Sequence, residues 1–107
     1  ECLIISPEII FSFTSFGFER FSTDTESLKS NTTGYENSAS GVESLKSNTT
    51  GYENTAFGSS ALFSNTVGIE NTAFGYQSLP LNSEGKYNTA SGYRSLYSNN
   101  TGDGSTA

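Results

Sequence analysis

The chain has 107 residues, enough for one domain, and carries 11 acidic against 5 basic residues for a net charge of −6. This balance argues against nucleic acid and anionic lipid as partners, because both are bound by clustered Lys and Arg. With no His and one Cys, the chain cannot form a Ser-His-Asp triad, a Cys-His pair or a common zinc site. We therefore expect neither an enzyme nor a bound cofactor or metal.

The first thirteen residues, ECLIISPEIIFSF, are the most hydrophobic part of the chain. Their β-branched and aromatic side chains predict one or two strands or an extended arm. Pro7 and Glu8 interrupt the apolar run, which is far short of a membrane span and lacks the basic segment of a signal peptide. We expect residues 1–13 to cap the region that follows, or to form an arm that inserts into a neighbouring subunit.

From residue 31 the sequence repeats every seventeen residues without an insertion or deletion. The full repeats read NTTGYENSASGVESLKS, NTTGYENTAFGSSALFS, NTVGIENTAFGYQSLPL and NSEGKYNTASGYRSLYS, and a partial repeat, NNTGDGSTA, follows. A decayed copy occupies residues 14–30. The chain thus divides into a hydrophobic arm, residues 1–13, and a repeat region, residues 14–107. Positions within a repeat are numbered from 1 at Asn31.

Several positions of the repeat keep one residue type. Position 1 is Asn, position 4 Gly, position 7 Asn, position 9 Ala, position 11 Gly and position 15 Leu in nearly every repeat. Helical-pair repeats need roughly thirty residues and leucine-rich repeats roughly twenty, so a period of seventeen fits one coil of a β-solenoid. The recurring Gly, Ser, Thr and Asn also disfavour helix. The predicted fold is all-β, a parallel β-solenoid or β-roll with seventeen-residue coils.

Stacked coils would place each residue about 4.8 Å from its copy, so that Asn, Ala and Leu form ladders along the solenoid. We predict that the Leu column points inward, and that the small Ala side chains fit a narrow interior. The Asn and Gly columns are assigned to corners, where these residue types tolerate positive φ. The predicted corner residues are Asn31, Asn48, Asn65, Asn82, Gly34, Gly51, Gly68 and Gly85.

The units NTAFGSSALFSNTVG and NTAFGYQSLPLNSEG resemble the head repeats of trimeric autotransporter adhesins, and are similar to repeats of bacterial and phage tail-fibre-like proteins. The resemblance covers residues 31–107 in full and residues 14–30 weakly. It implies a left-handed parallel β-roll, usually trimeric, that is displayed outside the cell for adhesion or as a spacer. The period of seventeen is longer than is common in those adhesin heads.

Two positions carry acidic side chains in register. Position 6 holds Glu19, Glu36, Glu53 and Glu70, and position 13 holds Glu26, Glu43, Ser60, Gln77 and Arg94. Carboxylates one coil apart repel, so the column at position 6 must face water, recruit Lys or bind cations such as calcium. We favour a solvated ridge there, and interpret position 13 as a varied surface column. Neither column makes a glycosidase-like pair, because nothing distinguishes one acid from its copies.

Aromatic residues recur at positions 5, 10, 12 and 16. A strip of Tyr and Phe on a flat roll would pack between protomers or hold a sugar, and we favour packing between protomers. The predicted partner is the chain itself, as a trimer or a head-to-tail filament, with a host surface or glycan as a further partner. The predicted assembly residues are Leu3, Ile4, Ile5, Ile9, Ile10, Phe11, Phe13, Phe57, Phe74, Tyr76 and Tyr93.

The functional hypothesis is a non-catalytic structural and adhesive module of an extracellular fibre or surface filament, self-associating through its aromatic columns and open coil ends. The alternative is a carbohydrate- or ice-binding solenoid that uses Thr and aromatic ladders. Both place the chain outside the cell or on its surface. Sequons begin at Asn31, Asn48 and Asn99, which are candidate acceptors of N-linked glycan on an exposed face.

Overall fold

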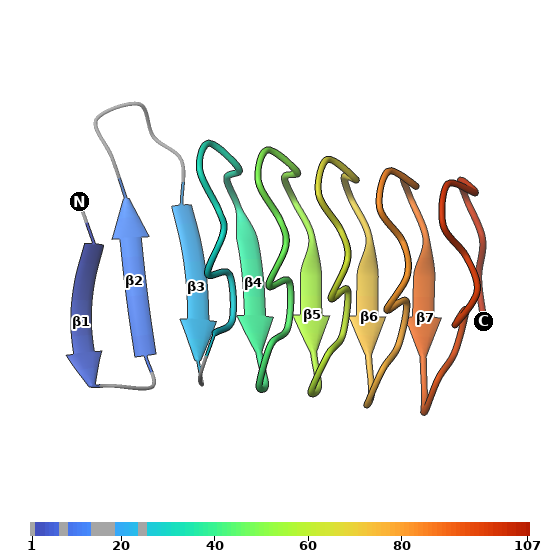
Figure 1. Ribbon diagram of the computed structural model, residues 1–107, viewed down its shortest axis with the longest axis horizontal. Helices are drawn as coiled ribbons and strands as arrows, with labels where there is room; N and C mark the ends of the chain where they lie inside the picture. The colour runs from blue at the N-terminus through green and yellow to red at the C-terminus, as the bar shows by residue number, and fades with distance from the viewer. Residues whose placement is uncertain (1, 7–8, 14–18, 24–25) are drawn as a thin grey trace.

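The computed structural model describes the backbone of residues 2–6, 9–13, 19–23 and 26–107, and the side chains of residues 26–107. Seven strands form one sheet in chain order (Figure 1). They are β1 (Cys2–Ser6), β2 (Ile9–Phe13), β3 (Glu19–Thr23), β4 (Asn37–Ser40), β5 (Thr55–Phe57), β6 (Thr72–Phe74) and β7 (Thr89–Ser91). No helix occurs among these described residues.

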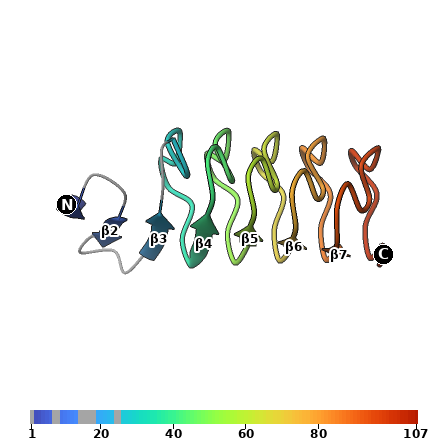
Figure 2. The ribbon, with the colours of Figure 1, turned by 90° about the horizontal axis from the view of Figure 1, so that it is seen from below.

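The sheet changes character at β3. Strands β1, β2 and β3 pair antiparallel, whereas β3 to β7 pair parallel throughout. Each parallel pairing joins residues seventeen apart, as in Ala39 with Ala56 and Ala56 with Ala73. Successive passes of the chain line up in a row with their strands along one side (Figure 2). The described residues are therefore all-β with parallel strands in one sheet, which is consistent with a solenoid-like fold.

Each strand is short because most of the seventeen residues form the segment that leads back to the start of the next strand. The backbone of this return segment also forms hydrogen bonds to the equivalent segment of the adjacent repeat. The backbone N–H groups of Thr32, Thr33 and Gly34 all donate to the carbonyl oxygen of Thr49, at 3.0, 3.1 and 3.1 Å. On the opposite side of the repeat, the Leu45 N–H donates to the Ala61 carbonyl at 2.9 Å. Hydrogen bonding between repeats thus extends well beyond the strands.

The core consists of the two columns that were expected to point inward, together with Ala61 of position 14. The Leu side chains at position 15 and the Ala side chains at position 9 are buried in one cluster. Leu45, Leu62 and Leu79 are 0 % exposed, and the partly buried Leu96 packs against the cluster. The inward assignment of both columns is confirmed.

The positive φ values agree with the corner assignment at the Gly column of position 11 and disagree with it at the Gly column of position 4 and at both Asn columns. In the described residues they occur at Gly of position 11, at Gly104, and at non-glycine residues of positions 6, 13 and 15, including Leu45 at 49° and Leu62 at 51°. The predicted corner residues Asn31, Asn48, Asn65, Asn82, Gly34, Gly51, Gly68 and Gly85 are absent from this set. A left-handed Leu costs about 1–2 kcal/mol, which the burial of its whole side chain offsets.

Glycine is required at position 4 for space rather than for φ. A Cβ on Gly34 would collide with the carbonyl oxygen of Gly51 and come within 2.8 Å of the Asn48 side-chain nitrogen. Residues 32–33 do form a bend, so this column lies at a turn of the chain as expected. The expected reason for glycine was wrong, because close approach between adjacent repeats decides this position.

One or two strands or an extended arm were expected within residues 1–13; two strands are present, and they extend the chain's own sheet through the antiparallel pairing of β2 with β3. The side chains of the predicted assembly residues Leu3, Ile4, Ile5, Ile9, Ile10, Phe11 and Phe13 lie outside the described residues, as does that of Glu19. Their role in assembly stays a prediction. Within the decayed repeat, residues 14–18 and 24–25 also lie outside the described residues.

Candidate functional surface

The Asn side chains of position 1 form a continuous hydrogen-bonded ladder. The Nδ2 of Asn48 donates to Oδ1 of Asn31 at 2.9 Å, and Asn65, Asn82 and Asn99 each donate to the Asn one repeat earlier. The same Nδ2 atoms donate to the carbonyl oxygen of the Gly three residues on, as Asn48 does to Gly51 at 3.0 Å. This amide ladder, predicted from the sequence, is confirmed and closes the Asn-x-x-Gly bends.

A second ladder runs along position 7. Asn54 and Asn71 each donate their backbone N–H and their Nδ2 to Oδ1 of the preceding Asn, and Nδ2 also reaches the Gly carbonyl of the following repeat. The Nδ2 of Asn88 joins the two ladders by donating to Oδ1 of Asn82 at 3.4 Å. Every buried side-chain nitrogen and oxygen atom in the described part of the chain has a hydrogen-bond partner. Buried polar groups here therefore hold the repeats together.

This packing bears on the candidate glycosylation sites. Asn48 is 0 % exposed, with Nδ2 committed to Asn31 and Gly51, so the folded chain has no room for a glycan on that nitrogen. The Nδ2 atoms of Asn31 and Asn99 donate to Gly34 and Gly102 respectively, and both residues are partly buried. The sequon prediction is wrong at Asn48. This turn residue was expected on the surface, but its side chain is buried and hydrogen-bonded within the fold.

The acidic columns differ in their surroundings. Glu36, Glu53 and Glu70 of position 6 are exposed, and no group of three or more acidic or Cys side chains gathers in residues 26–107 in a way that would hold a metal ion. At position 13, by contrast, Glu26 and Glu43 flank Lys46, whose Nζ lies 2.6 and 2.7 Å from their carboxylate oxygens. This arrangement links adjacent repeats through ion pairs.

The ion pairs shift two pKa values in opposite directions. The hydrogen bond from Lys46, with further attraction from Lys29, lowers the pKa of the Glu26 carboxyl below its usual range. Hydrogen bonds to Glu26 and then Glu43 raise the pKa of the Lys46 ammonium. This cluster was not predicted from the sequence, because copies within one position do not show contacts between different positions. Comparing position 13 with position 16 of the next repeat would have revealed the Glu26 and Lys46 pairing.

The aromatic columns form stacked pairs. Ring centroids lie 4.6 Å apart in Tyr35 and Tyr52, 5.2 Å in Phe57 and Phe74, and 5.8 Å in Tyr76 and Tyr93. The predicted assembly residues Phe57, Phe74, Tyr76 and Tyr93 are all exposed and meet in these pairs. Burial raises the pKa of the Tyr35 hydroxyl, and the neighbouring Tyr52, Glu53 and Glu36 raise it further.

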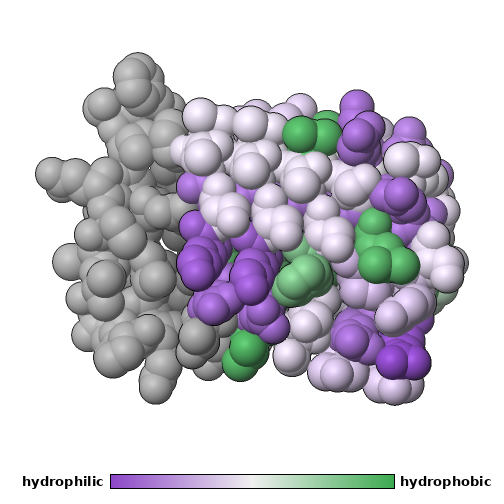
Figure 3. Space-filling model, viewed as in Figure 1, coloured by the Kyte–Doolittle hydropathy of each residue, from purple (hydrophilic) through white to green (hydrophobic). Residues whose placement is uncertain are grey.

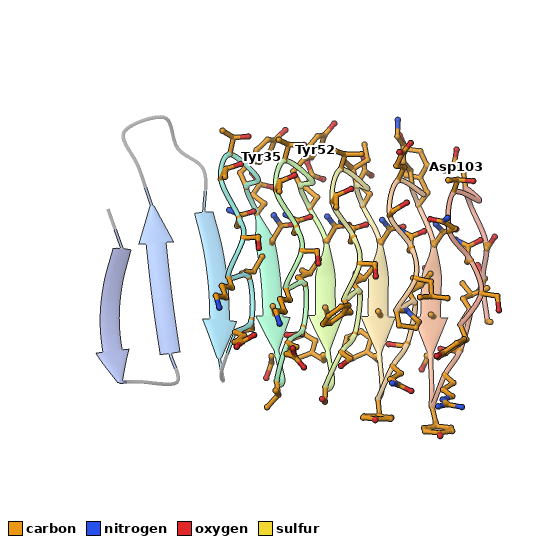
Figure 4. The ribbon with its side chains drawn as sticks, viewed as in Figure 1. Tyr35, Tyr52 and Asp103 are labelled. Carbon is orange, nitrogen blue, oxygen red and sulfur yellow. The ribbon has the colours of Figure 1, made fainter. Side chains whose placement is uncertain are left out.

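Equivalent positions share one edge of the molecule. Tyr35, Tyr52 and Asp103, all at position 5, lie along the same edge (Figure 4). On the face seen in Figure 3, hydrophobic side chains appear as separate spots among polar and near-neutral ones.

A mixed cluster joins the last two full repeats, and we call Tyr76, Gln77, Tyr93, Arg94 and Tyr97 the Arg94 cluster. The Nε of Arg94 donates to Oε1 of Gln77 at 2.9 Å. Its guanidinium carbon lies 5.4 Å from the Tyr93 ring centroid and 5.0 Å from that of Tyr97. Tyr76 and Tyr93 were predicted from the sequence as assembly residues, whereas Arg94 and Gln77 were expected to belong to a varied surface column.

Comparison of the chain with family models, curated proteins and solved structures finds no match. Among the described residues there is also no helix of the length and apolar character needed to cross a membrane. The proposed function therefore rests on the geometry of the repeats and on the chemistry of their surface. The resemblance to adhesin heads stays a prediction.

Proposed function

We propose that the chain is a β-solenoid with seventeen-residue coils and serves as a non-catalytic structural module of an extracellular fibre or surface filament. The single observation that carries this proposal is the pair of Asn ladders, whose bonds link each repeat to the next from Asn31 to Asn99 and from Asn37 to Asn88. In these ladders, buried polar side chains hold adjacent repeats together. A repeat that bonds mainly to its neighbours lengthens by addition and keeps its cross-section, as a spacer requires.

The experiment that tests this proposal adds one repeat. A second copy of residues 48–64 is inserted after Ser64, and small-angle X-ray scattering measures the longest dimension. The insertion should lengthen the particle by about 4.8 Å at constant cross-section and raise the free energy of unfolding. A Gly-Ser segment of equal length at the same site is the control, and should form a loop. If both insertions change the dimensions and stability alike, the repeat is not a stacking unit.

Self-association and adhesion belong to the same proposal, in keeping with the resemblance to trimeric adhesin heads. Their support is the exposure of Phe74, Tyr76 and Tyr93, since large apolar side chains on a surface favour contact with another protein. Sedimentation velocity across a concentration series tests assembly. We expect a trimer or filament for the full chain, and its loss on deletion of residues 1–13. A full chain that stays monomeric, or a deletion variant that assembles equally well, contradicts self-association through this arm.

A specific observation favours carbohydrate or ice binding as a second candidate. Thr55, Thr72 and Thr89 pair in register on the parallel strands, and no side-chain hydrogen bond in the described residues uses their hydroxyls. Regular hydroxyls beside stacked Phe57 and Phe74 give a surface suited to sugars or ordered water. Glycan-array binding or inhibition of ice recrystallisation tests this candidate.

A further inference from the structure

Arg94 and Lys86 are the two cationic side chains within residues 26–107 that no carboxylate neutralises, and Arg94 is the one held by neighbouring amide and aromatic side chains. Lys29 and Lys46 pair with acidic residues of position 13, whereas within residues 26–107 no acidic oxygen lies at ion-pair distance from the guanidinium of Arg94. In a chain with a net charge of −6, an exposed cation without an acidic partner is a notable feature.

The cluster holds this guanidinium in place before any ligand arrives. Gln77 accepts the Nε–H, and the rings of Tyr93 and Tyr97 lie within cation–π distance. Arg94 is nevertheless exposed, so its remaining N–H groups are accessible to a ligand. A guanidinium that is fixed by its neighbours loses little conformational entropy on binding. Its bidentate hydrogen bonding to a carboxylate is stronger for that reason.

The cluster also departs from the repeat pattern that builds the rest of the molecule. Positions 12 and 13 hold Val42 and Glu43, then Ser59 and Ser60, in the earlier full repeats. These pairs fit the same backbone, since Glu43 and Ser60 have φ values of 62° and 59°, close to the 55° of Arg94. Folding does not demand Arg and Tyr at these positions, so the fold leaves their chemistry free for binding.

The geometry points to a binding site for a saccharide that carries one carboxylate, such as a uronic or sialic acid, at the Arg94 cluster. The carboxylate would pair with Arg94, the C–H groups of the sugar would contact the exposed Tyr76 and Tyr93 rings, and the sugar hydroxyls would bond to Gln77 and the Tyr hydroxyls. One cation in an acidic chain suits a single carboxylate rather than a polyanion. The inference rests on the carbohydrate-binding candidate and does not depend on the structural proposal.

The test is an NMR titration of the full chain with methyl glucuronide and with N-acetylneuraminic acid, following the Arg94 side-chain N–H and the Tyr ring signals. Methyl glucoside tests the sugar without the charge, acetate tests the charge without the sugar, and a short acidic peptide tests the competing class of ligand. The main variant is Arg94→Gln, which copies Gln77, the residue at this position one repeat earlier. Lys86→Gln removes an equal charge outside the cluster and is the matched control.

We expect at least one acidic saccharide to shift the cluster signals, and Arg94→Gln to weaken that binding by about tenfold or more. Lys86→Gln should change it by less than about twofold. Equal affinity for acetate or for the acidic peptide overturns the inference, as does wild-type affinity in Arg94→Gln. Saccharide binding that shifts only signals outside the cluster also overturns it but leaves the carbohydrate candidate standing. Absence of binding by every saccharide, charged or neutral, removes both.

Discussion

Asn54 donates both its backbone N–H and its side-chain Nδ2 to Oδ1 of Asn37, at 3.0 and 3.1 Å. One acceptor atom of a buried side chain therefore receives two donors from the next repeat. The Asn54 Nδ2 also donates forward to the Gly68 carbonyl at 2.8 Å, so this single amide spans three repeats. Substitutions in this ladder test how much of the stability lies in such contacts.

Replacing Asn54 with Ala should destabilise the fold by about 3 kcal/mol, because it removes the Oδ1 that accepts the buried backbone N–H and Nδ2 of Asn71, together with the Nδ2 that donates to Asn37 and Gly68. Urea unfolding followed by circular dichroism measures the change. Asn100→Ala is the control, since the Asn100 side chain is exposed and accepts one hydrogen bond, from the Ser83 hydroxyl, and the substitution should cost less than about 0.5 kcal/mol. Similar losses for the two variants would contradict the role of the ladder.

Enlarging the Ala column should overpack the interior. Ala73 is fully buried in the core, so Ala73→Leu should cost roughly 1–3 kcal/mol. Glu53→Gln, at an exposed position between Glu36 and Glu70, should be neutral or slightly stabilising because it relieves repulsion along the column. Thermal unfolding ranks the two variants, and the reverse order would show that the inward and outward assignments are exchanged.

Gly58 and Gly92 occupy the same position of the repeat, and comparing them distinguishes backbone strain from lack of space as the reason for glycine there. Their φ values are 130° and 118°, so Ala at either site is strained by about 1–3 kcal/mol. A Cβ on Gly58 would also lie 2.6 Å from the Gly75 carbonyl carbon, whereas a Cβ on Gly92 meets nothing within 4 Å. Gly58→Ala should therefore be the more destabilising substitution in chemical unfolding. Equal losses would mean that strain alone decides this column.

The ion pairs of Lys46 predict how stability depends on pH. Because the pKa of Glu26 is lowered in the folded chain, its contribution is present above the unfolded value of about 4.5 and is lost as pH falls through the folded pKa. The raised pKa of Lys46 gives a contribution that is present below about 10.5 and is lost as pH rises through the folded pKa.

Melting temperatures of the native chain and of Lys46→Gln, measured from acidic to alkaline pH, test this dependence. The difference between the two proteins should be largest near neutral pH, shrink at both extremes and fall with added salt. Lys29→Gln is the control, because the Lys29 ammonium lies 3.8 Å from Glu26 and its side chain is 62 % exposed. A Lys46→Gln difference that is constant with pH would rule out the ion pairs as its source.

The sequence predicted the parts of the fold that follow from identity between repeats. Copies seventeen residues apart pair in register, so the Asn ladders and the inward Leu and Ala columns could be inferred from recurrence alone. These inferences need only a period and the spacing of parallel strands.

The rest depended on backbone angles and on contacts between different positions. Composition favours Gly and Asn for left-handed conformations, yet Leu45 and Glu53 adopt them, since the path of the whole repeat fixes the angle there. Likewise, the pairing of Lys46 with Glu26 and of Arg94 with Tyr97 crosses between columns. Such neighbours are set by the three-dimensional path of the return segment, which the periodicity does not encode.

The Asn ladder of position 1 also has a direction. In each of its links the Nδ2 belongs to the later repeat and the Oδ1 to the earlier one, from Asn48 and Asn31 to Asn99 and Asn82. The amide dipoles therefore add along the stack rather than cancel, and its two ends are chemically unlike. A further layer can join the ladder only with the same polarity, because a two-fold related contact would set acceptor against acceptor at one end and donor against donor at the other. Any end-to-end assembly of this molecule would therefore be head-to-tail, with every copy oriented in the same direction.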